Sequence, residues 1–250
     1  MPVPAVRLPC RAGSSLRAAA WACMALAAAT VCADSSPTRP LPPWSDSFTS
    51  RVEALALLQS LNADLLSHDS ATLTLDRWCD AHRMASPAKV VAERVRDAEK
   101  PPTPELRQTL AVEASEPVRY RRVRLRCGEH VLSEADNWYV PARLTAEMNK
   151  ALDSSDIAFG RAVQALHFQR RTLKANLLWA PLPEGWEMRS AAAGNTAGAG
   201  QKPGRLQIPP HVLQHQAVLT VPDGTPISVV VETYTSAVLA FPEPSEPVLH

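Results

Sequence analysis

Two strand–turn–strand blocks constrain the fold of this chain more than any other feature of its sequence. In the first, residues 121–126 and 132–140 flank a turn at 127–130. In the second, residues 215–221 and 227–235 flank the turn 222–225, where Gly224 can supply a positive φ. Apolar residues that alternate at a period of two favour antiparallel strands within each block. The sequence therefore predicts two β-hairpins.

The two blocks resemble each other in layout. In each, the second strand carries a polar residue eight or nine positions after the turn glycine: Asn137 follows Gly128, and Glu232 follows Gly224. This layout suggests a weak internal duplication, in which the two hairpins face each other and bring Arg121 near Glu232.

Glu232 is the residue in these strands that most needs an explanation, because a carboxylate among β-branched residues is costly to bury without a partner. The best candidate partner lies in residues 118–125, whose alternation defines one half-buried face. That face would carry Arg119, Arg121, Val123, Leu125 and Cys127. An arginine on such a face needs an anion. That anion is either the Glu232 carboxylate, in a purely structural pair, or the carboxylate of a ligand held by two parallel hydrogen bonds.

The first 33 residues have the pattern of a secretory signal peptide. Arg7, Arg11 and Arg17 precede an apolar stretch at 18–31, and residues 31–33 fit the small-x-small rule for cleavage. The stretch is too short for a comfortable membrane span, so no stable span is expected after cleavage. The sequence thus predicts a periplasmic or secreted protein.

The rest of the 250-residue chain predicts one domain. A Pro/Ser-rich linker at 34–46 precedes a domain at 47–241, a small-residue segment at 190–204 reads as a flexible insertion, and 242–250 forms a tail. Removal of the signal peptide lowers the formal charge from +1 to −2. Such a balance gives no indication of nucleic-acid binding. The oligomeric state stays open.

Only Cys79 and Cys127 remain after the signal peptide, and two cysteines in an exported chain suggest a disulfide. The alternative is that Cys79 and His82 form half of a zinc site. No second cysteine–histidine pair with metal-binding spacing follows, so a metal is not expected.

The remaining pattern mixes helices with strands, which predicts an α+β fold. Apolar spacing favours a helix at 47–66 and a helical stretch at 73–82. Residues 144–152 form a predicted helical stretch, in which Thr145 is a possible N-cap. Residues 154–160 are expected to form a loop, whereas 88–95 and 161–166 suit either a strand or a helix. His167 and His215 are expected to be core residues.

Four segments in order resemble the chorismate lyase family, whose enzymes split chorismate into 4-hydroxybenzoate and pyruvate. They are Leu-Leu-Ser-His-Asp-Ser-Ala-Thr at 65–72, Arg-Arg-Val-Arg-Leu at 121–125, Ile-Ala-Phe-Gly-Arg at 157–161, and the strand with Glu232. The resemblance implies a compact antiparallel sheet with helices mainly on one face and an enclosed ligand. The chain departs from the family at Ala71, where the enzyme has a larger residue, and in the segment 190–204.

The resemblance also implies roles for individual residues. Arg121 would grip a substrate carboxylate, Glu232 would lie at the reacting end, and Arg161 or Arg170 would hold a second carboxylate. Ser70, Phe159 and Gly160 would contact the substrate, and no cofactor would be needed.

Three functions remain open. The first is pyruvate elimination from chorismate, although an exported chain should seldom meet that cytosolic metabolite. The second is binding of a small aromatic or cyclic carboxylate without turnover. The expected fold also resembles the effector-binding domains of GntR-type regulators, which bind small anions in this way. The third is a structural envelope protein held by a Cys79–Cys127 bridge. Signatures of serine hydrolases, nucleotide-binding loops and zinc proteases are missing from the sequence.

Overall fold

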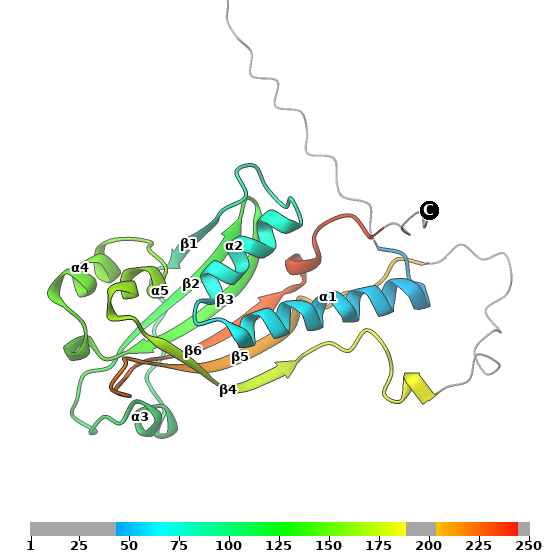
Figure 1. Ribbon diagram of the computed structural model, residues 1–250. Coiled ribbons are helices and arrows are strands. Elements are labelled where there is room, and N and C mark those ends of the chain that lie inside the picture. Colours follow the sequence, from blue (N-terminus) through cyan, green and yellow to red (C-terminus); the bar gives the residue numbers. More distant parts are fainter. Residues whose placement is uncertain (1–43, 189–203, 245–250) are drawn as a thin grey trace, which may run out of the picture. The chain divides into compact units, whose positions relative to one another are not determined.

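The computed structural model describes residues 44–188 and 204–244 (Figure 1). The predicted signal peptide, the predicted linker up to residue 43, the predicted insertion up to residue 203 and residues 245–250 of the predicted tail lie outside these ranges. None of the helices in the described ranges is long and apolar enough to cross a membrane.

A six-stranded antiparallel sheet forms the centre of the fold (Figure 1), in the order β1-β2-β3-β6-β5-β4. Its strands are β1 (Val90–Val95), β2 (Arg119–Cys127), β3 (His130–Tyr139), β4 (Gln169–Leu177), β5 (His211–Thr220) and β6 (Pro226–Thr235). The ambiguous segment 88–95 is thus a strand. Both predicted hairpins are present, as β2–β3 and β5–β6.

The two hairpins do not face each other. They lie side by side in one sheet, because β3 pairs with β6 along residues 133–139 and 228–234. In this register Glu232 lies opposite Ala135, and Arg121 lies opposite Asn137. The two hairpins therefore form one continuous sheet, which corrects the facing arrangement expected from the sequence.

Helices cover mainly one face of the sheet, and this confirms the α+β class. The helices are α1 (Phe48–Ser67), α2 (Ala71–Ala81), α3 (Pro104–Leu110), α4 (Ala146–Ser154) and α5 (Phe159–Ala162), with 3-10 turns at Pro141–Arg143, Gln164–Leu166, Trp186–Met188 and Ser236–Leu239. In α1, Leu58, Leu61 and Leu65 recur at helical spacing and are fully buried against the sheet. Ser47, Ser70 and Thr145 cap α1, α2 and α4 through side-chain oxygens. The segment 161–166 is helical.

Two elements were not predicted from the sequence. Helix α3 spans seven residues and packs Leu106 and Leu110 beneath Trp138 on the opposite face of the sheet. Strand β4 is an edge strand with mostly exposed residues, so it lacks the apolar alternation by which strands are recognised.

The described ends of the domain meet. Trp44 is buried and donates a hydrogen bond from Nε1 to the Phe241 carbonyl at 3.1 Å. The Ser45 hydroxyl donates to Glu243 at 2.8 Å, and the Asp46 N–H donates to the Gly204 carbonyl at 2.7 Å. Residues 44–46, expected to belong to the linker, are therefore packed into the domain, as is Glu243 of the expected tail.

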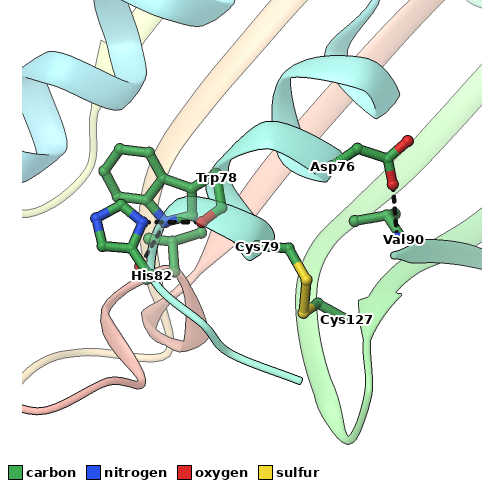
Figure 2. Close-up of a disulfide and its surroundings, with 7 residues drawn as sticks. Asp76, Trp78, Cys79, His82, Val90 and Cys127 are labelled. Atoms are coloured by element: carbon green, nitrogen blue, oxygen red, sulfur yellow. Dashed lines mark hydrogen bonds between the residues drawn. A yellow bond between two sulfur atoms is a disulfide. The ribbon is translucent and has the colours of Figure 1, made fainter. Parts of the chain in front are cut away.

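A disulfide joins α2 to the end of β2 (Figure 2). The sulfur atoms of Cys79 and Cys127 are bonded, and both side chains are fully buried. His82 does not serve as half of a zinc site with Cys79; its ring stacks on Phe241 and its Nδ1 contacts the Trp78 carbonyl at 2.8 Å. Within the described ranges, no group of His, Cys, Asp and Glu side chains could hold a metal ion.

Candidate functional site

A cavity lies between the helix-covered face of the sheet and the segments that close over it. Its lining residues are Asp69, Ser70, Ala71, Thr72, Arg121, Val123, Leu125, Ala135, Asn137, Phe159, Gly160, Phe168, Arg170, Leu219, Val230 and Glu232. Its volume is about 50 Å³, enough for roughly three or four water molecules. A depression of about 220 Å³ shares Asp69, Ser70, Gly160 and Phe168 with it. A ring-sized ligand therefore needs this shared wall to move outward.

Arg121 brings a buried cation to the cavity. Its exposed fraction is 2%, and β2 points it inward together with Val123 and Leu125. Its Nη1 donates to the Ile157 carbonyl at 2.6 Å and its Nη2 to the Ser155 carbonyl at 2.9 Å. Nε finds no hydrogen-bond acceptor among the described residues. Burial lowers the pKa of Arg121, and the nearby Arg94 adds to this.

Glu232 pairs with Arg170, which corrects the partner expected from the sequence. The Arg170 Nη2 lies 2.7 Å from the Glu232 Oε2, and their side chains are only 3% and 8% exposed. The Tyr234 hydroxyl donates to the same oxygen at 3.2 Å. The register explains the difference, because Arg121 lies two residues along the sheet from the row of Glu232. The long Arg170 side chain reaches Glu232 from β4.

The electrostatics around Glu232 follow from burial. Burial pulls the pKa of Arg170 down, but the Glu232 carboxylate outweighs this and raises it. Burial, followed by the Glu232 charge, raises the pKa of Tyr234 well above its ordinary range. Burial lowers the pKa of His215 to about 4. At neutral pH the ring of His215 and the hydroxyl of Tyr234 are therefore uncharged, and the charges here are those of Arg170 and Glu232.

Asn137 is a site residue that the sequence did not identify as one. It is buried in β3, directly opposite Arg121 on β2. Its Oδ1 accepts a hydrogen bond from the Ser228 hydroxyl at 2.6 Å, which orients the amide. The amide nitrogen is left as a donor at the cavity, beside the guanidinium of Arg121. The only sequence signal for this residue was its position as a polar group in an apolar strand.

Three of the residues implied by the resemblance line the cavity with Arg121 and Glu232. Ser70 caps α2, Phe159 packs its ring 5.5 Å from that of Tyr139, and Gly160 lies against Phe168. Arg161 does not reach the cavity. It binds Asp76 on α2 at 2.5 Å and lines the neighbouring depression instead. Arg170, the alternative to Arg161 for a second carboxylate, does line the cavity.

Comparisons with known proteins complete the description. No family model matches the chain. Among solved structures, the chain is similar to the ligand-binding domain of a putative GntR-family transcriptional regulator from Bordetella bronchiseptica, with 15% identity, a TM-score of 0.37, and coverage of 59% of this chain and 83% of that one. It is also similar to the effector domain of PhnF from Mycobacterium smegmatis, with 12% identity, a TM-score of 0.39, and coverage of 64% and 88%.

A much closer similarity exists at the level of sequence. The uncharacterized protein y4mC of Sinorhizobium fredii is 56% identical over 202 residues, which cover 80% of this chain and 83% of that protein. Identity at this level over most of both chains indicates common descent and a shared fold. The chain belongs to the same protein family as y4mC of Sinorhizobium fredii.

Proposed function

We propose that this domain binds a small organic carboxylate in the cavity and that Arg121 holds the carboxylate. One observation carries the proposal: the Arg121 guanidinium is 2% exposed and reaches the cavity with an Nε that has no acceptor among the described residues. A buried charge without a counter-ion is strongly unfavourable, and a bound anion relieves that cost. Carboxylates suit the planar guanidinium because they accept two parallel hydrogen bonds.

The remainder of the lining supports a ligand with an apolar body. Asn137 offers an amide N–H beside Arg121, so a carboxylate could be bound by both residues. The floor is aliphatic, and the Phe159 and Phe168 rings line the opposite wall. Few polar groups in an apolar enclosure are typical of small-molecule sites. An aromatic or cyclic carboxylate fits this combination best.

The test compares Arg121 with an arginine of the same strand that faces outward. Thermal shift and calorimetry with a panel of aromatic, cyclic and short aliphatic carboxylates should reveal at least one that stabilises the wild-type protein. Arg121→Lys keeps the charge but loses the planar fork, so it should weaken binding by at least ~10-fold. Arg122→Lys is the matched control and should bind normally. The proposal fails if no carboxylate binds, or if the two variants bind equally well.

Pyruvate elimination from chorismate is the second candidate. Its support is that Arg121 and Glu232 line the same cavity. Glu232, paired with Arg170, could accept the ring proton while the ether C–O bond breaks and enolpyruvate leaves, which makes the ring aromatic. Return of that proton to the methylene carbon of enolpyruvate gives pyruvate. Purified protein should then release 4-hydroxybenzoate from chorismate, and Glu232→Gln should abolish release. An inactive wild-type protein that still binds carboxylates leaves binding as the function.

We also propose that the protein is exported. The support is the signal-peptide pattern of residues 1–33 together with a buried Cys79–Cys127 disulfide, a bond that persists mainly in oxidising compartments. Cell fractionation and N-terminal sequencing of the mature protein test this. Cleavage before Asp34 in an extracytoplasmic fraction is the expected result, and an intact N-terminus in the cytosol would contradict it.

A further inference from the structure

We infer that Glu232 determines the charge of the ligand: by neutralising Arg170 it leaves Arg121 as the cation for one carboxylate, so the site accepts monocarboxylates and rejects dicarboxylates. This inference rests on the proposed carboxylate-binding function and adds the substrate class. It also counts against the second candidate function, because chorismate is a dicarboxylate. It assigns Glu232 a role in specificity that requires no turnover.

The charges around the cavity give the first step. Among the described residues that line it, the buried charged groups are Arg121, Arg170 and Glu232. Two guanidiniums and one carboxylate leave a net charge of +1. Asp69 also lines the cavity, but it is exposed at the rim, where its Oδ1 accepts the backbone N–H of Arg170 at 2.9 Å. Exposure to solvent screens its charge.

The acids that act electrostatically on Arg121, Asp153 and Asp156, each form an ion pair with another arginine. Asp153 binds Arg119 at 2.7 Å, and Asp156 lies 3.6 Å from Arg96. Both carboxylates are about half exposed, so water screens them as well. Within the described ranges no carboxylate lies within 4 Å of the Arg121 guanidinium, whose contacts are the carbonyls of Ser155 and Ile157. The charge of Arg121 is therefore available to a ligand.

A second ligand carboxylate would have to displace Glu232 from Arg170. The displaced Glu232 would keep the hydrogen bond from Tyr234 but lose its counter-ion at 6% exposure. His215, opposite Glu232 in the register, cannot replace that counter-ion because its ring is neutral. A buried carboxylate without a counter-ion is unfavourable enough for a preference of ~100-fold for the monocarboxylate.

The experiment uses ligands that differ in charge but not in shape. Terephthalate carries a second carboxylate where 4-nitrobenzoate carries a neutral nitro group of the same planar shape. Succinamate, which has a planar neutral amide in place of the second carboxylate, and succinate form a smaller pair, which also suits a cavity that opens little. Calorimetry on the full-length protein should show that the wild type prefers the monoanion of a pair by ~100-fold. Circular dichroism and urea unfolding verify that each variant is folded.

Two single variants change the net charge of the site in opposite directions, and a double variant leaves it unchanged. Glu232→Gln raises it to +2 and should reverse the preference towards the dicarboxylate. Arg170→Gln lowers it to zero and should weaken binding of the monocarboxylate by at least ~10-fold. The double variant restores +1 and should restore the preference for the monocarboxylate. Each single variant leaves one buried charge of the Arg170–Glu232 pair without its counter-ion, whereas the double variant leaves neither. The double variant therefore tests the inference even if a single variant is unstable.

The outcomes separate this inference from the proposed function. If no variant and no wild-type protein binds any of the four acids, carboxylate binding itself is wrong. If carboxylates bind and Glu232→Gln keeps the wild-type ratio of the two affinities, or the double variant fails to restore it, Glu232 does not select for charge and the inference is overturned.

Discussion

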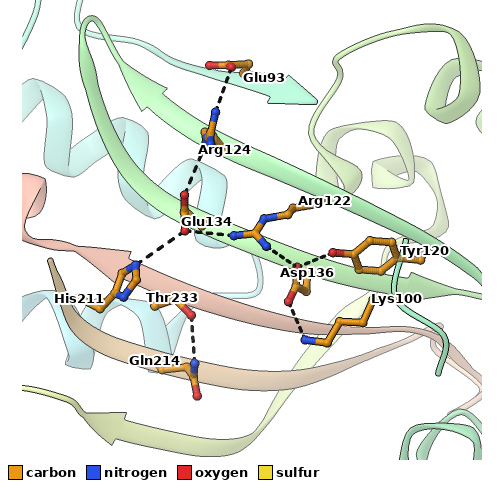
Figure 3. A network of polar contacts seen from close by, with 10 residues as sticks. All are labelled: Glu93, Lys100, Tyr120, Arg122, Arg124, Glu134, Asp136, His211, Gln214 and Thr233. Atoms are coloured by element: carbon orange, nitrogen blue, oxygen red, sulfur yellow. Dashed lines mark hydrogen bonds and ion pairs between the residues drawn. The ribbon is translucent and has the colours of Figure 1, made fainter. Parts of the chain in front are cut away.

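Arginines on the two faces of β2 have opposite surroundings. On the outer face, Arg122 lies 3.2 Å from Glu134, and Arg124 lies 3.5 Å from both Glu93 and Glu134 (Figure 3). These side chains are partly exposed, and their charges alternate across neighbouring strands. On the inner face, Arg121 is almost completely buried and bonds to carbonyls rather than to a carboxylate.

This difference indicates which arginine is free to recognise something outside the chain. The outer network is complete in itself: Asp136 also accepts the Tyr120 hydroxyl at 2.7 Å and binds Lys100 at 3.0 Å (Figure 3). Exposed ion pairs of this kind contribute little to stability, and the paired arginines have little charge available for a ligand. On the inner face, by contrast, the buried Arg121 cation lies at a cavity, and its burial is energetically unfavourable. One strand thus separates a solvated charge ladder from a recognition site by the simple alternation of its side chains.

Removal of one acid from each face should give the largest difference in stability between the two faces. Glu232→Leu leaves Arg170 buried without its counter-ion, and we expect it to lower the free energy of unfolding by about 3–5 kcal/mol. Glu134→Leu on the outer face should cost less than about 1 kcal/mol, because the arginines it leaves can turn to water. Urea unfolding of both variants measures the difference. Similar losses would mean that the two faces are energetically alike.

The disulfide should have the next largest effect, because it fixes the helix that closes the inner face. Cys79 and Cys127 are 48 residues apart, and removal of the cross-link by a Cys79→Ala, Cys127→Ala double variant should lower stability by about 4 kcal/mol in the chain-entropy model. Ala71 and Thr72 of the same helix line the cavity, so carboxylate affinity should fall as well. Chemical denaturation and calorimetry measure both. Unchanged affinity would show that the cavity does not depend on this cross-link.

A pair of histidines should give the smallest of the three effects. Burial lowers the pKa of His215 to about 4, below its ordinary value of 6.5. Between these pH values the unfolded chain binds the proton and the folded chain does not, so stability falls by about 3 kcal/mol as the pH decreases from 7 to 4. His215→Gln should flatten the stability profile across this range. His211→Gln, on the exposed outer face, should not, and equal profiles would contradict the assignment.

Much of the fold could be predicted from local patterns. Both hairpins followed from their alternation and turns, and α1 followed from Leu58, Leu61 and Leu65 at helical spacing. Strand β4 was missed because it lies at the sheet edge with most of its residues exposed, so no apolar face repeats along it. Helix α3 was missed because it is short and buries only Leu106 and Leu110.

The site was predictable in its members more than in its contacts. The alternation of β2 correctly turned Arg121 inward with Val123 and Leu125. The predicted pairing of Arg121 with Glu232 was wrong, because Glu232 pairs with Arg170. Arg170 lies on β4, the strand that the sequence pattern did not predict. Neither the register between β3 and β6 nor the reach of a long side chain can be inferred from spacing along one strand. Arg161 lies outside the cavity because Asp76 on α2 holds it, a contact that spacing along the chain does not indicate, and its contact with a ligand stays a prediction.

The contact between the two ends of the domain has a practical consequence. Trp44 bonds to the carbonyl of Phe241, and Ser45 bonds to Glu243, so the chain enters and leaves the domain at one point. Domains with adjacent ends tolerate insertion into surface loops and circular permutation. Residues 44–244 should therefore fold when spliced into a surface loop of a host protein, without pulling the two sides of that loop apart.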